Sequence, residues 1–303
     1  MSTPRGWSKR RKIAVGSIAA WLLATVVVGV VFGIKGHKDQ SFLPQSEFHL
    51  LTWVHIVGPL NIDKGFLYLA IAAVITIGTM VWIARRMQMR PNRVQTAVEW
   101  AYALCRDQIA GDNMSPDMAR KWFPLIATLF FFILVSNLIG YIPLPVDSEY
   151  PFHLLGVSIP SFQIYAATTN VAFPLVLALI VWISFNVEGV RAHGPGGYLK
   201  SLIPAGVGGG MVLFIFPLEL LSNFLRLLSL TIRLWANLLA GHLLIAFMSG
   251  DLAVLLGLKI LPLVLLPVGV AIFLFEAVLI AGLQAFIFAI LAAIYLGGAV
   301  SRH

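Results

Sequence analysis

The stretch FPLELLSNFLRLLSLTIRLWANLLAGHLLIAFMSG, residues 216–250, decides the fold and directs the search for a functional site. Its length and apolar composition predict a transmembrane helix, since a bilayer crossing needs about 20 mainly apolar residues. The stretch nevertheless contains Glu219, Arg226 and Arg233, and a charge at the centre of a membrane helix costs roughly 2.5–3.5 kcal/mol on insertion scales. Leucine would anchor the protein at lower cost, so these groups indicate a function within the membrane.

Six residues of this stretch share one side of the predicted helix. Spacings of four and three residues keep successive side chains on one face, because an α-helix has 3.6 residues per turn. His242 follows Arg233 by nine residues, which turns its side chain to roughly the opposite face. The helix is therefore expected to present a fixed cation to one neighbour and a titratable group to another. The six residues are Glu219, Asn223, Arg226, Leu230, Arg233 and Asn237.

The composition of the whole chain indicates a polytopic membrane protein. Of the 303 residues, 59% are hydrophobic and 11% are charged, whereas soluble domains carry about 25% charged residues. The net charge of +8 comes from basic residues in short loops beside apolar runs, a pattern typical of membrane proteins and not of nucleic-acid binding. The single cysteine, Cys105, excludes an internal disulfide. The sequence contains no nucleotide-binding loop, zinc spacing or dinucleotide motif, so no cofactor or metal is expected.

The N-terminus permits two interpretations. Residues 1–12 are basic and precede an apolar run at 13–34. A cleaved signal peptide has an apolar region of roughly 7–15 residues that ends at a small-residue cleavage site. The run here is longer and no clear cleavage motif follows it, which favours a retained helix with its N-terminus inside. We therefore separate residues 1–34 from a single helical domain at 35–303.

The rest of the chain predicts an all-α protein of about six membrane helices in the cell inner (plasma) membrane, with both termini on the cytoplasmic side if residues 1–34 are retained. Residues 94–120 are amphipathic and are expected to lie along the cytoplasmic surface, and 144–163 is expected to be an outer loop. Pro174 is expected to kink its span, and Pro262 and Pro267 to interrupt the last one. The spans that follow the first are predicted at 66–84, 122–143, 165–187, 211–249 and 253–296.

Polar side chains gather in the last two predicted spans. In an antiparallel hairpin, His242 would lie near the outer end of the first span and Glu276 deeper along the second. Imidazole and carboxyl groups can take up and release protons, while Asn237 and Gln284 can hold water between them. Hydrogen bonding between helices is the simpler interpretation for Asn223 and Gln284 taken alone. The ionisable groups together are typical of an ion path through a water-filled cavity.

Arg233 needs a different explanation, because a guanidinium stays protonated at any accessible pH and cannot relay protons. Its expected role is electrostatic: it promotes proton release from a carboxyl group brought near it and repels cations that would leak past. Arg226 is interpreted as structural, either neutralising Glu219 on the same face or extending to the membrane interface. Asn137 and Gly140 are expected to supply an interhelical hydrogen bond and a close-packing position.

Several motifs resemble subunit a of the rotary F-type ATP synthase, the stator half of its proton channel. The run SLTIRLWANLLAGH at 229–242 paired with LQAFIF at 283–288 carries the resemblance, and this pair is highly specific. LELLSN at 218–223, followed by Arg226, extends it. So do SNLIGYIP at 136–143 and the TTN that ends at Asn170, so that the matches span roughly residues 90–300.

The resemblance implies a role for each matching residue. Arg233 would be the essential arginine facing the carboxylates of the ring of c subunits, and the last two helices would form a long hairpin against this rotor. Protons would enter an outer half-channel, protonate a ring carboxylate and leave by an inner half-channel near Glu219. Asn223, Arg226 and Asn170 would be supporting residues. The outer half-channel would be lined by Asn237, His242, Glu276 and Gln284.

The resemblance also implies a subunit that is not an enzyme on its own. Its partners would be the c-ring, the b or b′ subunits of the peripheral stalk, the rest of the ATP synthase and membrane lipid. A proton-coupled secondary transporter is the main alternative, although such proteins often contain internal repeats and none is visible here. A membrane scaffold without transport is a second alternative, and it would tolerate leucine at positions 233 and 242.

Three features depart from the pattern of the family. Leu227 stands where many members have proline, and the basic segment 1–34 is an addition. Glu276 precedes Gln284 by eight residues where seven is commoner. On a regular α-helix, eight residues place two side chains about 80° apart around the axis, so both can line one polar cleft. The departure from the commoner spacing leaves the direction of Glu276 an open point.

Overall fold

A computed structural model describes residues 9–33, 52–54, 62–154, 157–163, 167–201, 211–248, 252, 256–258 and 260–300. The architecture is helical, as the sequence predicts, with two small antiparallel strand pairs between helices. The chain divides into two compact units, which we describe separately. The smaller contains Met1–His49 and Gly241–Phe275, and the larger contains Leu50–Ala240 and Glu276–His303.

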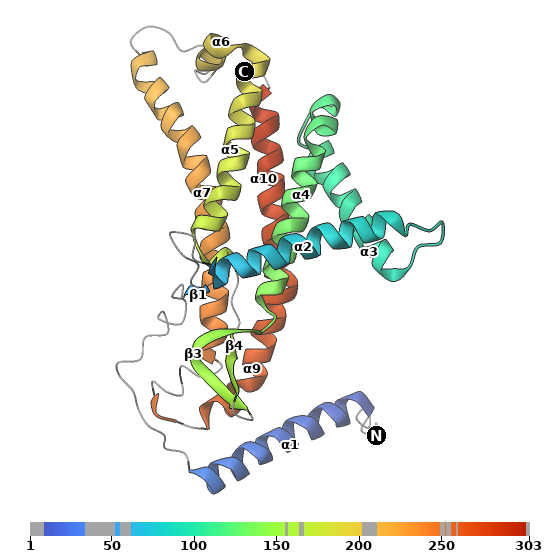
Figure 1. Cartoon of the computed structure of the whole chain (residues 1–303), viewed down its shortest axis with the longest axis vertical. Helices are drawn as coiled ribbons and strands as arrows, with labels where there is room; N and C mark the ends of the chain where they lie inside the picture. The colour runs from blue at the N-terminus through green and yellow to red at the C-terminus, as the bar shows by residue number, and fades with distance from the viewer. Residues whose placement is uncertain are drawn as a thin grey trace, which may run out of the picture. The chain divides into compact units, whose positions relative to one another are not determined.

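The larger unit is built from long apolar helices, several of which run side by side (Figure 1). Its core is continuous and contains buried side chains from α4, α5, α7 and α10 and from the short η2. The long helices are α2 (Lys64–Arg85), α4 (Pro116–Gly140), α5 (Ala172–His193), most of α7 (Val212–Ala246) and α10 (Ala281–Val300). Shorter elements are α3 (Arg93–Ala103), η2 (Leu104–Gly111), η3 (Ala167–Thr169), α6 (Pro195–Ser201) and η6 (Glu276–Ile280).

Close packing fixes α10 against the segment that precedes α4. A Cβ atom at Gly297 would come well within 3.0 Å of the carbonyl oxygen of Asn113, so this contact requires glycine. At the other end of the same helix pair, Asn137 of α4 donates to the backbone of α10. The two helices are therefore antiparallel and in contact near both ends.

The smaller unit contains α1 (Lys9–Phe32), α9 (Leu261–Phe275) and the last turns of α7. Within the described residues, five helices are long and apolar enough to cross a membrane, and α1 contributes a shorter apolar segment, Val15–Val28. The five are Gly65–Arg85, Pro116–Gly140, Ala172–His193, Val212–Ala246 and the continuous stretch Leu261–Val300. Multiple membrane-capable helices confirm the predicted class of a polytopic membrane protein.

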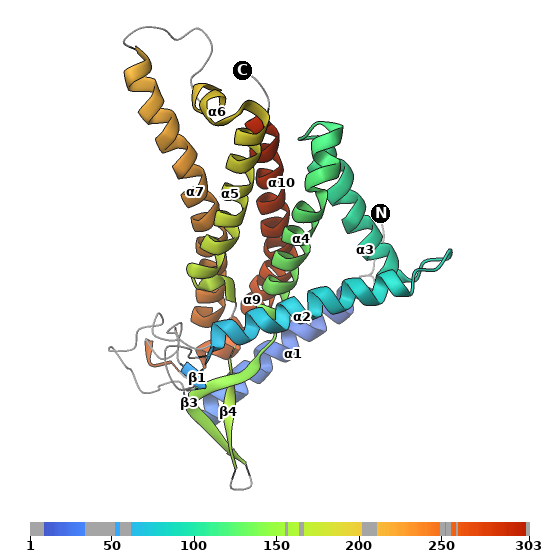
Figure 2. The ribbon, with the colours of Figure 1, turned by 45° about the horizontal axis from the view of Figure 1, so that its top comes forward.

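Two segments between helices contain short strands. β3 (Leu144–Leu154) pairs with β4 (Val157–Gln163) as an antiparallel hairpin, where the sequence predicts an irregular outer loop (Figure 2). A second, very small pair joins β1 (Thr52–Val54) to β2 (Ile62–Asp63).

The prolines act differently from the prediction. Pro174 lies in the first turn of α5, where its missing N–H removes no helical hydrogen bond, so the predicted kink is wrong. Pro262 lies at the start of α9, while Pro267 lies inside α9 without ending it. The irregular turn of the last span is instead η6, a π-helical turn that begins at Glu276.

Candidate functional site

A buried carboxyl group lies where α4 ends against the last helix. Glu276 is 9% exposed, and Tyr141, directly after α4, is 5% exposed. The Tyr141 hydroxyl donates to Glu276 Oε2 at 3.4 Å, which is longer than the roughly 2.5–3.0 Å typical of O–H···O bonds. The hydroxyl therefore makes a long, weak hydrogen bond to the carboxyl group. Sequence reasoning did not single out Tyr141, although it lies within the SNLIGYIP motif.

The π-helical turn η6 explains how Glu276 and Gln284 come to share a face. On a regular α-helix, their spacing of eight residues would separate them around the axis. The i→i+5 bonds of a π-turn enclose one more residue than an α-turn, so the extra residue is absorbed within η6. Both side chains consequently lie on the buried side of the helix, with Gln284 only 3% exposed.

Two residues of α4, Ser136 and Asn137, carry buried polar atoms without a hydrogen-bond partner among the described residues. Asn137 is fully buried, and its Nδ2 donates to the carbonyl of Ala281 at 3.4 Å, in agreement with the predicted interhelical hydrogen bond. Among the described residues, Asn137 Oδ1 and Ser136 Oγ have no hydrogen-bond partner. Buried polar atoms of this kind are typical sites of ordered water. The interface between α4 and the last helix therefore offers polar groups that water can bridge.

The residues of the polar stripe predicted on α7 are buried to different degrees. Leu230 and Asn223 are buried, together with Leu227, Leu234 and Leu238. Arg226, Arg233 and Glu219 are only partly buried, and Asn237 is exposed. Burial therefore varies along this stripe, because the leucine face of α7 turns toward the core and carries Asn223 and Leu230 with it.

Arg233 is partly buried and lies beside the core face of α7. Its Nη2 contacts the hydroxyl of Ser229 at 3.5 Å. No carboxylate in the described part of the chain pairs with Arg233 within 4.0 Å. Two residues further along, Trp235 Nε1 donates to the carbonyl of Thr169 at 2.9 Å, which fixes α7 against η3. The guanidinium is thus held on an anchored helix with its charge available to another molecule.

The first half of α7 is held by hydrogen bonds to α5. Asn223 Nδ2 donates to Asn186 Oδ1 at 2.9 Å, and Trp182 Nε1 donates to the carbonyl of Asn223 at 3.2 Å. Arg226 lies over the ring of Tyr295 in α10, 5.4 Å from its centroid, which is a cation–π contact. Arg226 therefore has an aromatic partner, and the first of its two predicted roles, neutralising Glu219, finds no ion pair among the described residues.

The remaining predicted residues lie at separate places. Asn170 Oδ1 accepts a hydrogen bond from the backbone N–H of Ala172 at 3.0 Å, which stabilises the start of α5. His242 is 3% exposed, in the last turns of α7 that belong to the smaller unit. Glu219 lies near the beginning of α7 and is partly buried.

Sequence reasoning missed one ion pair that joins α4 to α5. Lys121 Nζ contacts both carboxylate oxygens of Glu188, at 2.6 and 2.8 Å, and Arg191 lies 3.9 Å from the same carboxylate. The side chain of Glu188 is only 8% exposed. The sequence does contain a signal for this pair, because a lysine stands at the start of one apolar run and an acid at the end of another. The two residues are 67 positions apart, so the sequence does not show that they meet.

The family model and the similar proteins all point to the same family. The family model described as "ATP synthase A chain" matches residues 66–297. The chain is 34% identical over 251 residues to "ATP synthase subunit a" of Nocardioides sp., which covers 80% of this chain and 83% of that protein. It is 36% identical over 239 residues to "ATP synthase subunit a" of Rubrobacter xylanophilus, and the match covers 78% of this chain and 83% of that protein. The protein of the same name from Hyphomonas neptunium is 31% identical over 266 residues, and the match covers 85% of this chain and 95% of that protein. The helical membrane architecture, the arginine on α7 and these matches together show that the chain belongs to the ATP synthase A chain family.

Proposed function

We propose that this protein is the proton-translocating stator subunit of the membrane sector of an F-type ATP synthase. The observation that carries the proposal is Arg233, a partly buried cation in an apolar helix whose described contact is a neutral hydroxyl. A charge in the membrane is costly unless a partner compensates it. A carboxylate presented by the c-ring is the natural partner, because it would meet Arg233 once in each passage.

Protons enter through an outer half-channel and protonate a c-ring carboxylate. A neutral carboxyl group can then travel through the lipid, whereas a charged one pays the insertion cost. After nearly a full rotation the group reaches an inner half-channel near Glu219 and loses its proton beside Arg233. Arg233 blocks the direct route, so proton flux turns the ring, driven by about 2.3 kcal/mol per elementary charge per 100 mV. The outer half-channel is assigned to Asn237, His242, Glu276 and Gln284.

The buried groups around Glu276 support this assignment. Tyr141 donates a hydrogen bond to the carboxyl group, and the unpaired atoms of Asn137 and Ser136 provide positions for water. A chain of carboxyl group and water, with the amides holding the water in place, can pass protons without carrying any other ion. Asn223, Arg226 and Asn170 serve as supporting residues, since their described contacts hold helices together.

The protein acts within the complete ATP synthase. We assign the c-ring, the b or b′ subunits of the peripheral stalk and membrane lipid as its partners. Residues 35–303 form the subunit a domain, preceded by the additional segment 1–34. Basic residues beside the apolar helices favour the plasma membrane orientation in which both termini are cytoplasmic. A secondary transporter is not favoured, because the matched relatives are consistently named as subunit a.

The experiment that tests the proposal is ATP-driven acidification of inverted membrane vesicles carrying Arg233→Ala. We expect pumping to be lost while passive proton leak through membranes stripped of the catalytic sector persists or rises. Arg191→Ala is the matched control, because Arg191 is 63% exposed at the end of α5 and should leave pumping intact. Unchanged pumping in Arg233→Ala would refute the electrostatic gate.

A further inference from the structure

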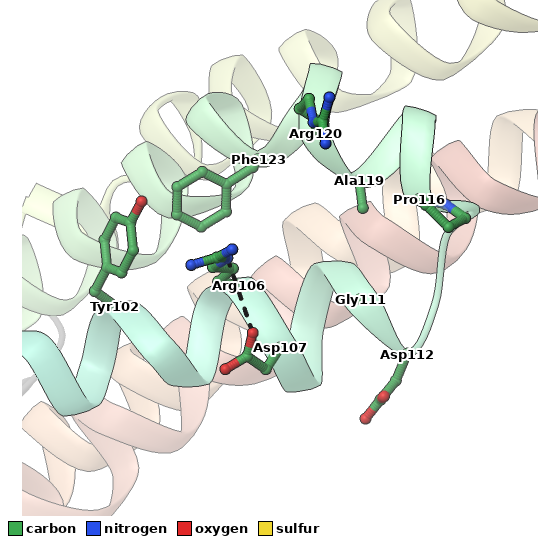
Figure 3. A pocket seen from close by; sticks show the side chains of 9 residues that line it. All are labelled: Tyr102, Arg106, Asp107, Gly111, Asp112, Pro116, Ala119, Arg120 and Phe123. Carbon is green, nitrogen blue, oxygen red and sulfur yellow. Dashed lines mark ion pairs between the residues drawn. The ribbon is translucent and has the colours of Figure 1, made fainter.

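A cavity of about 600 Å³ lies between η2 and the first turns of α4, outside the residues assigned to proton transfer (Figure 3). Arg106 lines it from η2 and Arg120 from α4, and the rings of Tyr102 and Phe123 lie beside Arg106. The two rings meet edge to face with their centroids 4.9 Å apart. The cavity thus combines two guanidinium groups with an aromatic wall.

The two arginines retain most of their charge for a ligand. Among the described residues, Arg106 forms one ion pair, with Asp107 at 4.0 Å, and both side chains are at least 70% exposed. Such exposed pairs contribute about 0–1 kcal/mol and are easily exchanged. No described carboxylate pairs with Arg120 within 4.0 Å, whereas the neighbouring Lys121 is engaged by Glu188. Figure 3 shows the side chain of Asp112 directed away from the two arginines.

The local backbone builds this cavity. η2 is a π-helical segment, and its i→i+5 pattern continues to the bond from the Asp112 N–H to the Asp107 carbonyl at 3.1 Å. π-helical turns are rare and frequently occur at functional sites. A Cβ atom at Gly111 would lie 3.2 Å from the carbonyl of Arg106, so the tight end of this segment favours glycine.

The position along the chain places the cavity at the membrane boundary. The apolar run of α4 begins at Trp122, immediately after Arg120 and Lys121. Aromatic and basic side chains together are typical of the headgroup region of a bilayer. Basic pockets beside membrane helices bind anionic lipid headgroups, and guanidinium groups match phosphate oxygens with paired hydrogen bonds.

We propose that this cavity binds the phosphodiester of an anionic phospholipid, with Arg106 and Arg120 as its ligands and the ring of Phe123 against the glycerol and upper acyl carbons. A soluble phosphate could use the same two guanidinium groups. The lipid is favoured because the lining includes Phe123, which lies in the apolar run of α4 just after Arg120.

The test uses the complete ATP synthase in nanodiscs of phosphatidylcholine that contain a small fraction of photoreactive phosphatidylglycerol. Labelling of residues 102–123 is measured by mass spectrometry for the native complex and for Arg106→Gln/Arg120→Gln. We expect labelling to fall about tenfold in this variant, because two charge-assisted contacts are lost. Arg106→Lys keeps the charge but not the paired geometry and should give an intermediate yield. Arg90→Gln/Arg93→Gln is the matched control, since it removes the same charge from the adjacent basic segment.

Equal labelling of the native complex and Arg106→Gln/Arg120→Gln would overturn the proposal. An equal loss in Arg90→Gln/Arg93→Gln would also overturn it, because general electrostatic attraction would then suffice. A third arm adds millimolar inorganic phosphate: suppression of labelling at constant ionic strength would assign the site to soluble phosphate and overturn the lipid assignment. ATP-driven pumping should persist in every variant, so failure of this proposal is distinguishable from failure of the proposed transport function.

Discussion

Replacing Lys121 by methionine should destabilise the contact between α4 and α5. The change removes the ammonium group that contacts both oxygens of Glu188, whose side chain is 8% exposed, while Lys121 itself is 48% exposed. Removing one partner of a fully buried ion pair costs about 3–5 kcal/mol, whereas an exposed pair contributes about 0–1 kcal/mol. Because Lys121 is half exposed and Arg191 lies 3.9 Å from the carboxylate, we expect an intermediate loss of about 2 kcal/mol.

A double-mutant cycle distinguishes this pair from a general effect of lost packing. Adding Glu188→Gln to Lys121→Met removes the uncompensated charge, so the double variant should recover about half of the loss or more. The assay heats the purified complex and measures how much subunit a remains assembled, by size-exclusion chromatography with fluorescence detection. Lys200→Met is the matched control, because Lys200 is exposed on α6. The reasoning is refuted if Lys121→Met is as heat-stable as Lys200→Met, or if the double variant is less stable than Lys121→Met alone.

Two further predictions concern packing and thiol chemistry. Gly297→Ala should lower the free energy of unfolding by about 1–3 kcal/mol and so reduce heat stability, because the new methyl group would overlap the backbone carbonyl of Asn113. Gly298→Ala has open space around its Cβ and should be tolerated, so equal behaviour of the two variants in the same heating assay would contradict the close contact. Burial raises the pKa of the Cys105 thiol to about 12, so the reactive thiolate is scarce at pH 8. Maleimide should therefore label Cys105 only after denaturation, and rapid labelling of the folded complex would show that the thiol is accessible.

Local sequence was sufficient for the class of fold and for the family. Apolar runs long enough to cross a bilayer identify the helices, because the cost of exposing backbone polar groups to lipid leaves few alternatives to a helix. The charges at Glu219, Arg226 and Arg233 stand out for the same reason, since each one is expensive in that setting. The motif around Arg233 needs no tertiary information, because its residues are contiguous in the chain.

Contacts between distant residues could not be predicted in this way. Tyr141 and Glu276 are 135 residues apart, and hydropathy carries no information about which helices become neighbours. The same applies to the contact between Arg226 and the ring of Tyr295, which neither of the two predicted roles of Arg226 included.

The sequence by itself determined which segments are helices and which polar residues they carry, because both follow from local composition and spacing. Only the tertiary structure decided which way those residues face. Packing of the leucine side of α7 buries Asn223 and leaves Arg233 at its edge, and the π-helical turn at Glu276 aligns that residue with Gln284. Both outcomes depend on how one helix packs against its neighbours, and a periodic pattern along a single helix does not predict that packing.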